Sequence, residues 1–264
     1  MVHDSEFVLT ELTIALPRGA SHLTPFAPED RARQIQTNIG SAATSIGKLA
    51  DRQFRLELLD PSAPGGRPAR RFIEARYNDI FGSHVRVRYP RLLVLSDSRG
   101  RVVAAVGIRR ACDGPLFLEH YLDTSAEKAI AALSAGSVSR DAIVELGSFA
   151  AGSSRAAMYV IAGMAAYMRQ QSFSHAMVTS TGRLRRLFAH FDFDLMCLGE
   201  ARKDALPNDG SDWGLYYDDG PRVLVGLVHQ CFEAVLRDRN RQNVASRVAI
   251  LDDLILQAQA LSPC

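Results

Sequence analysis

The stretch from residue 141 to residue 171 limits the possible folds more than any other part of the sequence. It reads "DAIVELGSFAAG" followed directly by "SSRAAMYVIAGMAAYMRQQ". The first half is a nearly continuous apolar run, which is typical of a strand buried at the centre of a sheet. The second half is long and rich in small residues, which is typical of a helix packed on such a sheet. The pair predicts an α/β fold in which a central strand leads straight into a helix.

The rest of the chain supplies further elements by the same periodicity. Strands are predicted at residues 53–61, 91–97, 101–111, 115–123, 175–181, 194–201 and 222–230. Helices are predicted at residues 69–84, 124–136, 182–191 and within 231–261. The short "DSRG" connection makes the strands at 91–97 and 101–111 antiparallel neighbours. Gly82 marks the end of the first helix, and Thr124 with Glu127 forms a capping-box pattern at the second.

These elements divide the chain into three predicted segments. Residues 1–52 form an N-terminal extension with a strand at 6–16 and a helix opened by "TPFAPED". Residues 53–230 form the main domain, an α/β (α+β) unit with a mixed central sheet flanked by helices. Residues 231–264 form a C-terminal helical segment, whose apolar positions are also compatible with a homodimer contact.

Composition bears on the partners and the cellular location of the protein, not on its fold. The 264 residues are 47% hydrophobic, which suffices for a large core, and the net charge of +2 gives no bulk argument for nucleic acid or an anionic membrane. The N-terminus lacks the pattern of a secretory signal, and no window reaches the roughly 18 apolar residues of a membrane span. The four cysteines show neither metal nor disulfide spacing, so we expect a cytoplasmic protein without a metal site.

Two polar residues stand out in the apolar stretch "PLFLEHYLD" at residues 115–123. If this stretch is extended, Phe117, Glu119 and Tyr121 share one face and His120 lies on the other. Glu119 therefore lies on a half-buried face. Glu119 and His120 are candidate site residues. A polar pair at the rim of a strand is the alternative for both residues.

Four segments carry a resemblance to a known family. "LFLEHYLD", "IVELGSFA", "VTSTGRLRRLF" and "WGLYYDDGPRVLVG" occur in the order typical of the bacterial thermostable hemolysin family, over about residues 68–230. The order of strands and helices also resembles the fold of GNAT acyltransferases and acyl-homoserine-lactone autoinducer synthases. This resemblance implies an N-acyltransferase that moves an acyl group from a thioester to the amine of a small molecule, such as an amino acid derivative.

The resemblance also implies a place for the acyl donor. In that fold the strand corresponding to "AIVELGSFAA" parts from its neighbour, and the pantetheine arm of the donor pairs with the freed main chain. The following turn opens a helix whose N–H groups can meet a phosphate. A small-residue turn before any helix is the alternative. The implied donor-binding residues are Phe149, Ala150, Ala151, Gly152, Ser153, Ser154 and Arg155.

The same turn departs from the GNAT pattern Arg/Gln-x-x-Gly-x-Gly/Ala, because only Gly152 and a displaced arginine are present. Autoinducer synthases also lack the full loop and commonly take acyl groups from acyl carrier protein, so the resemblance implies acyl carrier protein as the alternative donor to coenzyme A. Arg183, Arg185 and Arg186 at the start of the helix at 182–191 could attract such an acidic carrier. A solvated helix face is the alternative for these arginines.

Transfer of an acyl group to an amine needs a base, and Glu145 is the leading candidate. It lies in the predicted central strand, where loss of solvation raises the pKa of a carboxyl. A buried ion pair, with Arg109 or Arg110 as partner, is the structural alternative. For Glu119 and His120, the resemblance implies binding of an amine or a role as a second base.

Other residues are candidates for substrate contacts. Arg109 and Arg110 end the third strand, and alternation sends them to opposite faces, so at most one can hold an acceptor carboxylate in the cleft. Ser148 lies in the central strand but not in a Gly-x-Ser-x-Gly elbow. The aromatic candidates for a pocket wall are Tyr121, Trp213, Tyr216 and Tyr217, for which plain packing is the alternative.

Two other function classes remain open. The family name suggests a membrane-acting cytolysin, although no amphipathic or alternating insertion segment is visible. A noncatalytic binding module on the same fold is the second alternative.

Overall fold

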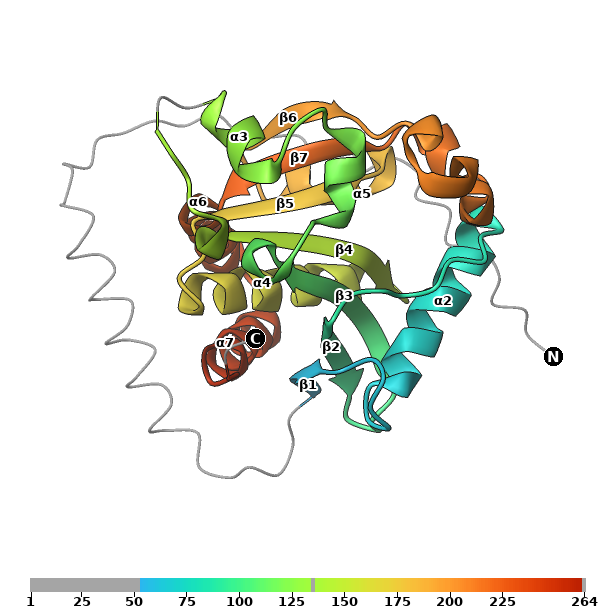
Figure 1. Cartoon of the computed structure of the whole chain (residues 1–264). Helices are drawn as coiled ribbons and strands as arrows, with labels where there is room; N and C mark the ends of the chain where they lie inside the picture. The colour runs from blue at the N-terminus through green and yellow to red at the C-terminus, as the bar shows by residue number, and fades with distance from the viewer. Residues whose placement is uncertain (1–52, 134–135, 263–264) are drawn as a thin grey trace. The chain divides into compact units, whose positions relative to one another are not determined.

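A seven-stranded sheet forms the centre of the computed structural model, which describes residues 53–133 and 136–262. The strands lie in the order β1-β2-β3-β4-β5-β7-β6, and only β4 and β5 are parallel (Figure 1). Their bounds are Phe54–Leu59 (β1), Arg91–Asp97 (β2), Val102–Arg110 (β3), Ile143–Ala151 (β4), His175–Ser180 (β5), Leu195–Glu200 (β6) and Arg222–Leu227 (β7). The predicted central strand is thus confirmed as β4, and the predicted hairpin as β2 and β3.

One face of the sheet carries the largest core. Helix α4 (Ser154–Gln170) follows β4 and is buried along most of its length, as its small side chains predict. Helices α5 (Gly182–His190), α6 (Val228–Arg241) and α7 (Ala245–Gln259) contribute to the same core. Packing of α7 on α4 encloses Leu254, Ile255 and Ala258, each 0% exposed.

Helix α7 also closes one edge of the sheet. The Gln257 side chain accepts a hydrogen bond from the Leu56 N–H at 2.9 Å and donates one to the Phe54 carbonyl at 3.1 Å. An amide side chain therefore takes the place of a further strand beside β1. The described residues all belong to one compact unit, Lys48–Cys264. The division at residues 230 and 231 stays a prediction.

The other face carries α2 (Arg67–Phe81), α3 (Ala126–Ala131) and short 3-10 turns. Helix α2 ends at Gly82, as predicted, because its φ of 63° is easy for glycine. The capping-box prediction at α3 is wrong: Ser125, not Thr124, precedes the helix, and its hydroxyl donates to Glu127 at 2.7 Å.

Two further predictions differ from the structure. The predicted strand at 115–123 is wrong, since Phe117–Tyr121 form a 3-10 turn, η2. N–H groups of this turn bond to carboxylates, and around Glu145 both sides of β4 are taken by β3 and β5. The predicted strand at 222–230 ends at Leu227, where α6 begins. The predicted N-terminal strand and helix lie outside the described residues.

Candidate functional site

Strands β4 and β5 pair over only part of their length. The parallel ladder joins Ile143–Leu146 to His175–Val178, although β4 continues to Ala151 and β5 to Ser180. A bulge in β4 follows at once, with Ser148 at a φ of 48° and a register shift against β3. Beyond Leu146, the side of β4 that faces β5 has no strand partner among the described residues. An extended ligand can pair with main chain of this kind.

We call the stretch where residues 147–151 of β4 no longer pair with β5 the opening. The N-terminus of α4 follows directly after it. Ser153 is the N-cap, and its hydroxyl accepts a hydrogen bond from the Ala156 N–H at 3.2 Å. The N–H of Gly152 donates to the Val103 carbonyl at 2.9 Å and is not available to a ligand. Ser154 and Arg155 are exposed, and their N–H groups have no partner within residues 53–133 and 136–262. The positive end of α4 is therefore open to an anionic group.

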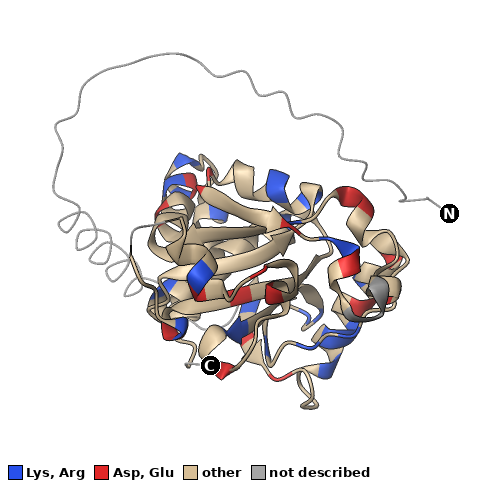
Figure 2. Ribbon diagram, turned by 45° about the horizontal axis from the view of Figure 1, so that its top comes forward, with Lys and Arg blue, Asp and Glu red and all other residues tan. Residues whose placement is uncertain are grey.

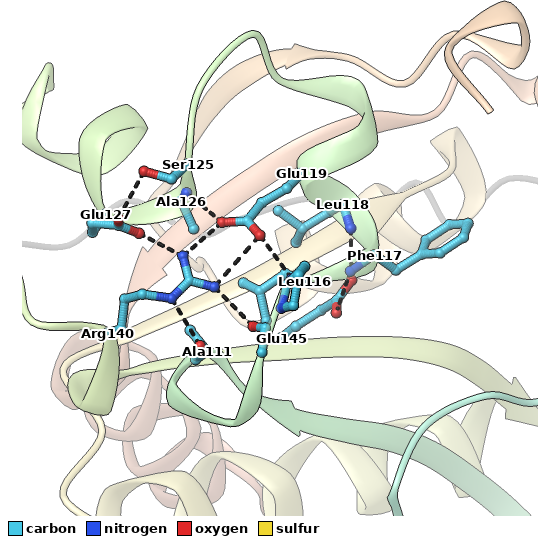
Figure 3. A network of polar contacts seen from close by, with 12 residues as sticks. Ala111, Leu116, Phe117, Leu118, Glu119, Ser125, Ala126, Glu127, Arg140 and Glu145 are labelled. Atoms are coloured by element: carbon cyan, nitrogen blue, oxygen red, sulfur yellow. Dashed lines mark hydrogen bonds and ion pairs between the residues drawn. The ribbon is translucent and has the colours of Figure 1, made fainter. Parts of the chain in front are cut away.

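Glu145 lies in β4 just before the opening, with its side chain 1% exposed. Its carboxylate accepts hydrogen bonds from the N–H groups of Phe117 at 3.0 Å and Leu118 at 2.9 Å (Figure 3). Arg109 Nη1 lies 3.8 Å from Oε2. Burial raises the pKa of Glu145, and these N–H groups, Arg109 and a Tyr89 hydrogen bond oppose that rise only in part. The raised pKa is compatible with a role of Glu145 in proton transfer. The same carboxylate also anchors η2.

Tyr89 is a site residue that the sequence analysis missed. Its ring covers Gly107 of β3 and Gly147 of β4, where any Cβ would collide with it. Arg109 lies over the same ring, 5.2 Å from its centroid. The signal was present in the sequence, because glycine inside a strand often marks the close approach of another group.

Arg109 and Arg110 lie on opposite faces of the sheet. Arg109 shares the face of Glu145 and donates to the carbonyl oxygens of Arg88 at 2.8 Å and Pro115 at 3.5 Å. These contacts favour a structural role for Arg109 over capture of an acceptor carboxylate. Arg110 lies away from Glu145, in a hollow that is also lined by Asp60, Pro90, Arg91, Ile108 and Asp113.

Glu119 is held by its own chain. It accepts hydrogen bonds from the N–H groups of Leu116 at 2.8 Å and Ala126 at 2.7 Å, and it pairs with Arg140 at 2.8 Å (Figure 3). Burial would raise the pKa of Glu119, but Arg140 and the two N–H groups outweigh it and hold the pKa below its usual value. These contacts favour the structural alternative. His120 is exposed, and its ring lies 5.6 Å from that of Phe117.

Aromatic side chains line the same face near η2. We define the aromatic wall as Phe117, Tyr121, Trp213 and Tyr217. The hydroxyls of Tyr121 and Tyr217 lie 2.7 Å apart, and Trp213 lies 5.7 Å from Phe117 and 6.1 Å from Tyr217, centroid to centroid. Burial raises the pKa of Tyr217 to about 12, so both phenols stay protonated. Three predicted pocket residues, Tyr121, Trp213 and Tyr217, are therefore brought together.

Tyr216, the fourth predicted aromatic, is buried behind the wall. It stacks on Tyr77, and its hydroxyl donates to the Thr179 carbonyl at 3.4 Å. The Thr179 hydroxyl is buried and has no hydrogen-bond partner in the part of the chain that the structure describes. Thr179 belongs to the portion of β5 beyond the ladder with β4. A buried hydroxyl that the sequence analysis did not single out therefore lies on the part of β5 that no longer pairs with β4.

Charges of both signs are distributed over the described elements (Figure 2). Within residues 53–133 and 136–262, no helix is long and apolar enough to cross a bilayer. The same residues contain no group of three His, Cys, Asp or Glu side chains that could hold a metal ion.

A comparison with protein families decides the membership of this chain. Residues 59–232 match the family described as thermostable hemolysin. The chain belongs to the thermostable hemolysin family. The resemblance to this family expected from the sequence is confirmed, and so is the expected α/β fold with a mixed central sheet flanked by helices. No curated protein matches the chain.

Solved structures of three acyltransferases are similar to this member of the family. FeeM, an N-acyl amino acid synthase from uncultured soil microbes, is 13% identical with a TM-score of 0.48, covering 73% of this chain and 97% of its own. MesI, a CoA-dependent acyl-homoserine lactone synthase, is 15% identical with a TM-score of 0.45, covering 72% and 97%. A GNAT-family acetyltransferase from Staphylococcus aureus Mu50 is 8% identical with a TM-score of 0.38, covering 66% and 99%.

Proposed function

We propose that this protein is an N-acyltransferase that moves an acyl group from an acyl thioester to the amine of a small molecule, such as an amino acid derivative. The observation that carries the proposal is the parting of β4 and β5 after Leu146, directly before the open N-terminus of α4. The pantetheine arm of a donor would pair with β4 beyond Leu146. Its phosphate would meet the N–H groups of Ser154 and Arg155.

The chemistry requires one bond to form and one to break. The amine nitrogen attacks the thioester carbonyl, the C–N bond forms, the C–S bond breaks, and the sulfur leaves as a thiol. A proton must leave the nitrogen, and Glu145 remains the predicted base. Because both Glu145 oxygens accept main-chain N–H bonds, the structure also supports a role in which Glu145 only positions η2.

The carrier of the acyl group is coenzyme A or acyl carrier protein. Arg183 and Arg186 are exposed on α5, which follows β5. Arg185 instead donates to the carbonyl oxygens of Ser180 at 2.8 Å and Gly220 at 3.0 Å. Two exposed arginines beside the opening favour a negatively charged carrier surface, whether a nucleotide or a protein.

The experiment measures thiol release from acyl-CoA and from acyl carrier protein, with a panel of amines as acceptors. Hydrogen exchange of residues 149–155 is recorded with and without each donor. We expect one donor to slow exchange in this segment and to be consumed when an accepted amine is present. Unchanged exchange with both donors would overturn the placement of the donor.

A matched pair of variants locates the phosphate. Arg155→Glu puts an acid beside the proposed phosphate and should raise the donor KM by about tenfold or more. Arg169→Glu makes the same change at the other, exposed end of α4 and should leave the donor KM unchanged. Equal effects of the two variants would contradict a phosphate at the N-terminus.

The same purified protein also tests the two alternative functions, a membrane-acting cytolysin and a noncatalytic binding module. On this proposal, the purified protein releases no dye from lipid vesicles in the absence of an acyl donor. Dye release proportional to protein would support a cytolysin instead. Donor binding without turnover by any amine would support a noncatalytic module.

A further inference from the structure

Arg140 precedes β4 and uses every N–H group of its guanidinium. Nε donates to the Ala111 carbonyl at 2.8 Å, and Nη2 donates to the Gly114 carbonyl at 2.9 Å. Nη1 donates to Glu119 at 2.8 Å and to Glu127 at 2.6 Å, and Nη2 also reaches Glu119 at 3.5 Å. A guanidinium has five donors, and all five are matched. Arg140 therefore ties together four points of the irregular segment 111–127 (Figure 3).

Glu119 passes this restraint on to η2. Its Oε2 accepts from the Leu116 N–H and its Oε1 from the Ala126 N–H, so one carboxylate joins both ends of the segment 116–126. Arg140 holds that carboxylate with two hydrogen bonds. If Arg140 moves, the Glu119 carboxylate should move with it and shift the Leu116 N–H that it binds.

Leu116 is followed by the residues that face the proposed reaction. The N–H groups of Phe117 and Leu118 bond to Glu145, and the Phe117 ring lies against Trp213 of the aromatic wall. Hydrogen bonds connect Arg140 through Glu119 to the Leu116 N–H, and the peptide bond from Leu116 to Phe117 completes the link to this part of the site.

We propose that Arg140 is a positioning residue for the acyl transfer: acting through Glu119, it sets the place of residues 116–118, and with them the two N–H groups on Glu145 and the Phe117 face of the aromatic wall. This inference rests on the function proposed above, and it adds that the aromatic wall forms part of the acceptor pocket. Arg140 itself touches neither Glu145 nor the wall.

The proposal has a consequence for the protonation of Glu145. The groups that act on this carboxylate are Arg109 from β3, Tyr89 from the segment before β2, Tyr121 from η2, and the two N–H groups. If η2 moves, the two N–H groups that lower the pKa of Glu145 are lost, while Arg109 and Tyr89 stay in place because they lie on other segments. The desolvated carboxylate then holds its proton to higher pH.

Arg140→Lys tests the proposal, because an ammonium has three donors on one atom and cannot match the four acceptor groups. We expect the acceptor KM to rise about tenfold with little change in donor KM, and the rising limb of kcat/KM to move to higher pH. Trp213 is the single tryptophan, so its fluorescence should change without any substrate. Amide exchange at Phe117 and Leu118 should become faster.

Two control variants isolate the route through Glu119. Arg237→Lys makes the same substitution at an exposed arginine of α6, which has no proposed role in the site, and should behave as wild type. Glu127→Gln removes one acid from Arg140 but leaves the Arg140–Glu119 bonds, so Trp213 emission and the pH profile should stay unchanged.

Each outcome decides the proposal. If Arg140→Lys lowers stability but keeps wild-type Trp213 emission, amide exchange and acceptor KM, Arg140 is only structural and the proposal falls. If Arg140→Lys does not fold, Glu119→Gln is measured in its place with the same expectations.

If wild-type protein transfers no acyl group, the proposed function fails. Trp213 emission and amide exchange then still show whether Arg140 positions η2, and unchanged values would refute that.

Discussion

Glu145 and Glu119 show how neighbours give the same side chain opposite properties. Both are largely buried and both accept two main-chain N–H bonds. Glu119 also has Arg140 at 2.8 Å, whereas the nearest guanidinium nitrogen to Glu145 is at 3.8 Å. Burial raises the pKa of Glu145, which is 1% exposed, whereas Arg140 and the N–H groups outweigh the burial of Glu119, which is 15% exposed, and lower its pKa. Of the two carboxyls, only that of Glu145 has its pKa shifted upward, which is the direction that a general base near neutral pH requires.

Glu145→Gln tests this assignment at the level of one atom. If Glu145 is the base, turnover should fall by roughly 10²-fold or more, because the amide cannot accept the proton. The rise of the rate with pH should also disappear. Thiol release is measured across the pH range, with circular dichroism to show that the fold survives. Near-normal turnover would leave Glu145 as an anchor of η2 alone.

Glu119 should contribute to stability in a pH-dependent way. Its folded pKa lies below the unfolded value of 4.5, so its contribution is present above that pH and is lost as the pH falls through the folded value. We expect Glu119→Gln to be less stable than wild type at neutral pH, with the difference shrinking in acid. Urea unfolding over this range measures it. Glu233→Gln, at an exposed position of α6, should show no such convergence.

At the scale of elements, two facing glycines decide what lies over the sheet. Gly107 and Gly147 are paired across β3 and β4, and Tyr89 fills the space that two Cβ atoms would occupy. This packing brings the Tyr89 hydroxyl to Glu145. The two glycines, by leaving room for Tyr89, thus determine which group contacts the Glu145 carboxylate.

Gly147→Ala should force Tyr89 away from the sheet. Overpacking of this kind costs about 1–3 kcal/mol of the free energy of unfolding, and loss of the Tyr89 contact should raise the pKa of Glu145 further. Chemical denaturation and the pH profile of activity measure the two effects. Gly65→Ala is the matched control, because its Cβ would meet nothing within 4 Å. A wild-type stability for Gly147→Ala would contradict the close packing of Tyr89.

At the scale of the whole molecule, the core extends beyond the part that defines the family. The family match ends at residue 232, whereas α7 buries Leu254 and Ile255 on α4 and closes the β1 edge with Gln257. The α4 face of the sheet therefore needs residues outside the match to exclude water.

Removal of residues 245–264 should abolish cooperative folding. The truncation would expose the apolar surface of α4 that α7 covers, and it would leave polar groups of β1 unpaired. We expect a broad thermal transition and aggregation, measured by circular dichroism and light scattering. A chain ending at residue 262 is the control and should unfold cooperatively. Sharp unfolding of the longer truncation would show that residues up to 244 suffice.

Patterns along the chain were sufficient for most of the elements, because hydrophobic periodicity is a local property. The run from Ile143 to Gln170 predicted the central strand and its helix, and the "DSRG" turn predicted the hairpin. The motif segments also led to the family. Tyr121, Trp213 and Tyr217 were candidates for a pocket wall, but only the fold brings them together.

The environment of the candidate site depended on contacts between distant parts of the chain. Residues 115–123 alternate like a strand, but the carboxylate of Glu145, 27 and 28 positions away, binds their N–H groups and turns them into η2. The sequence around Glu119 is compatible with a catalytic role, but the fold brings Arg140, 21 positions away, into a hydrogen bond with its carboxylate. A charge or an N–H group acts over a few ångströms in space, and sequence periodicity carries no information about which distant residue the fold brings to that distance.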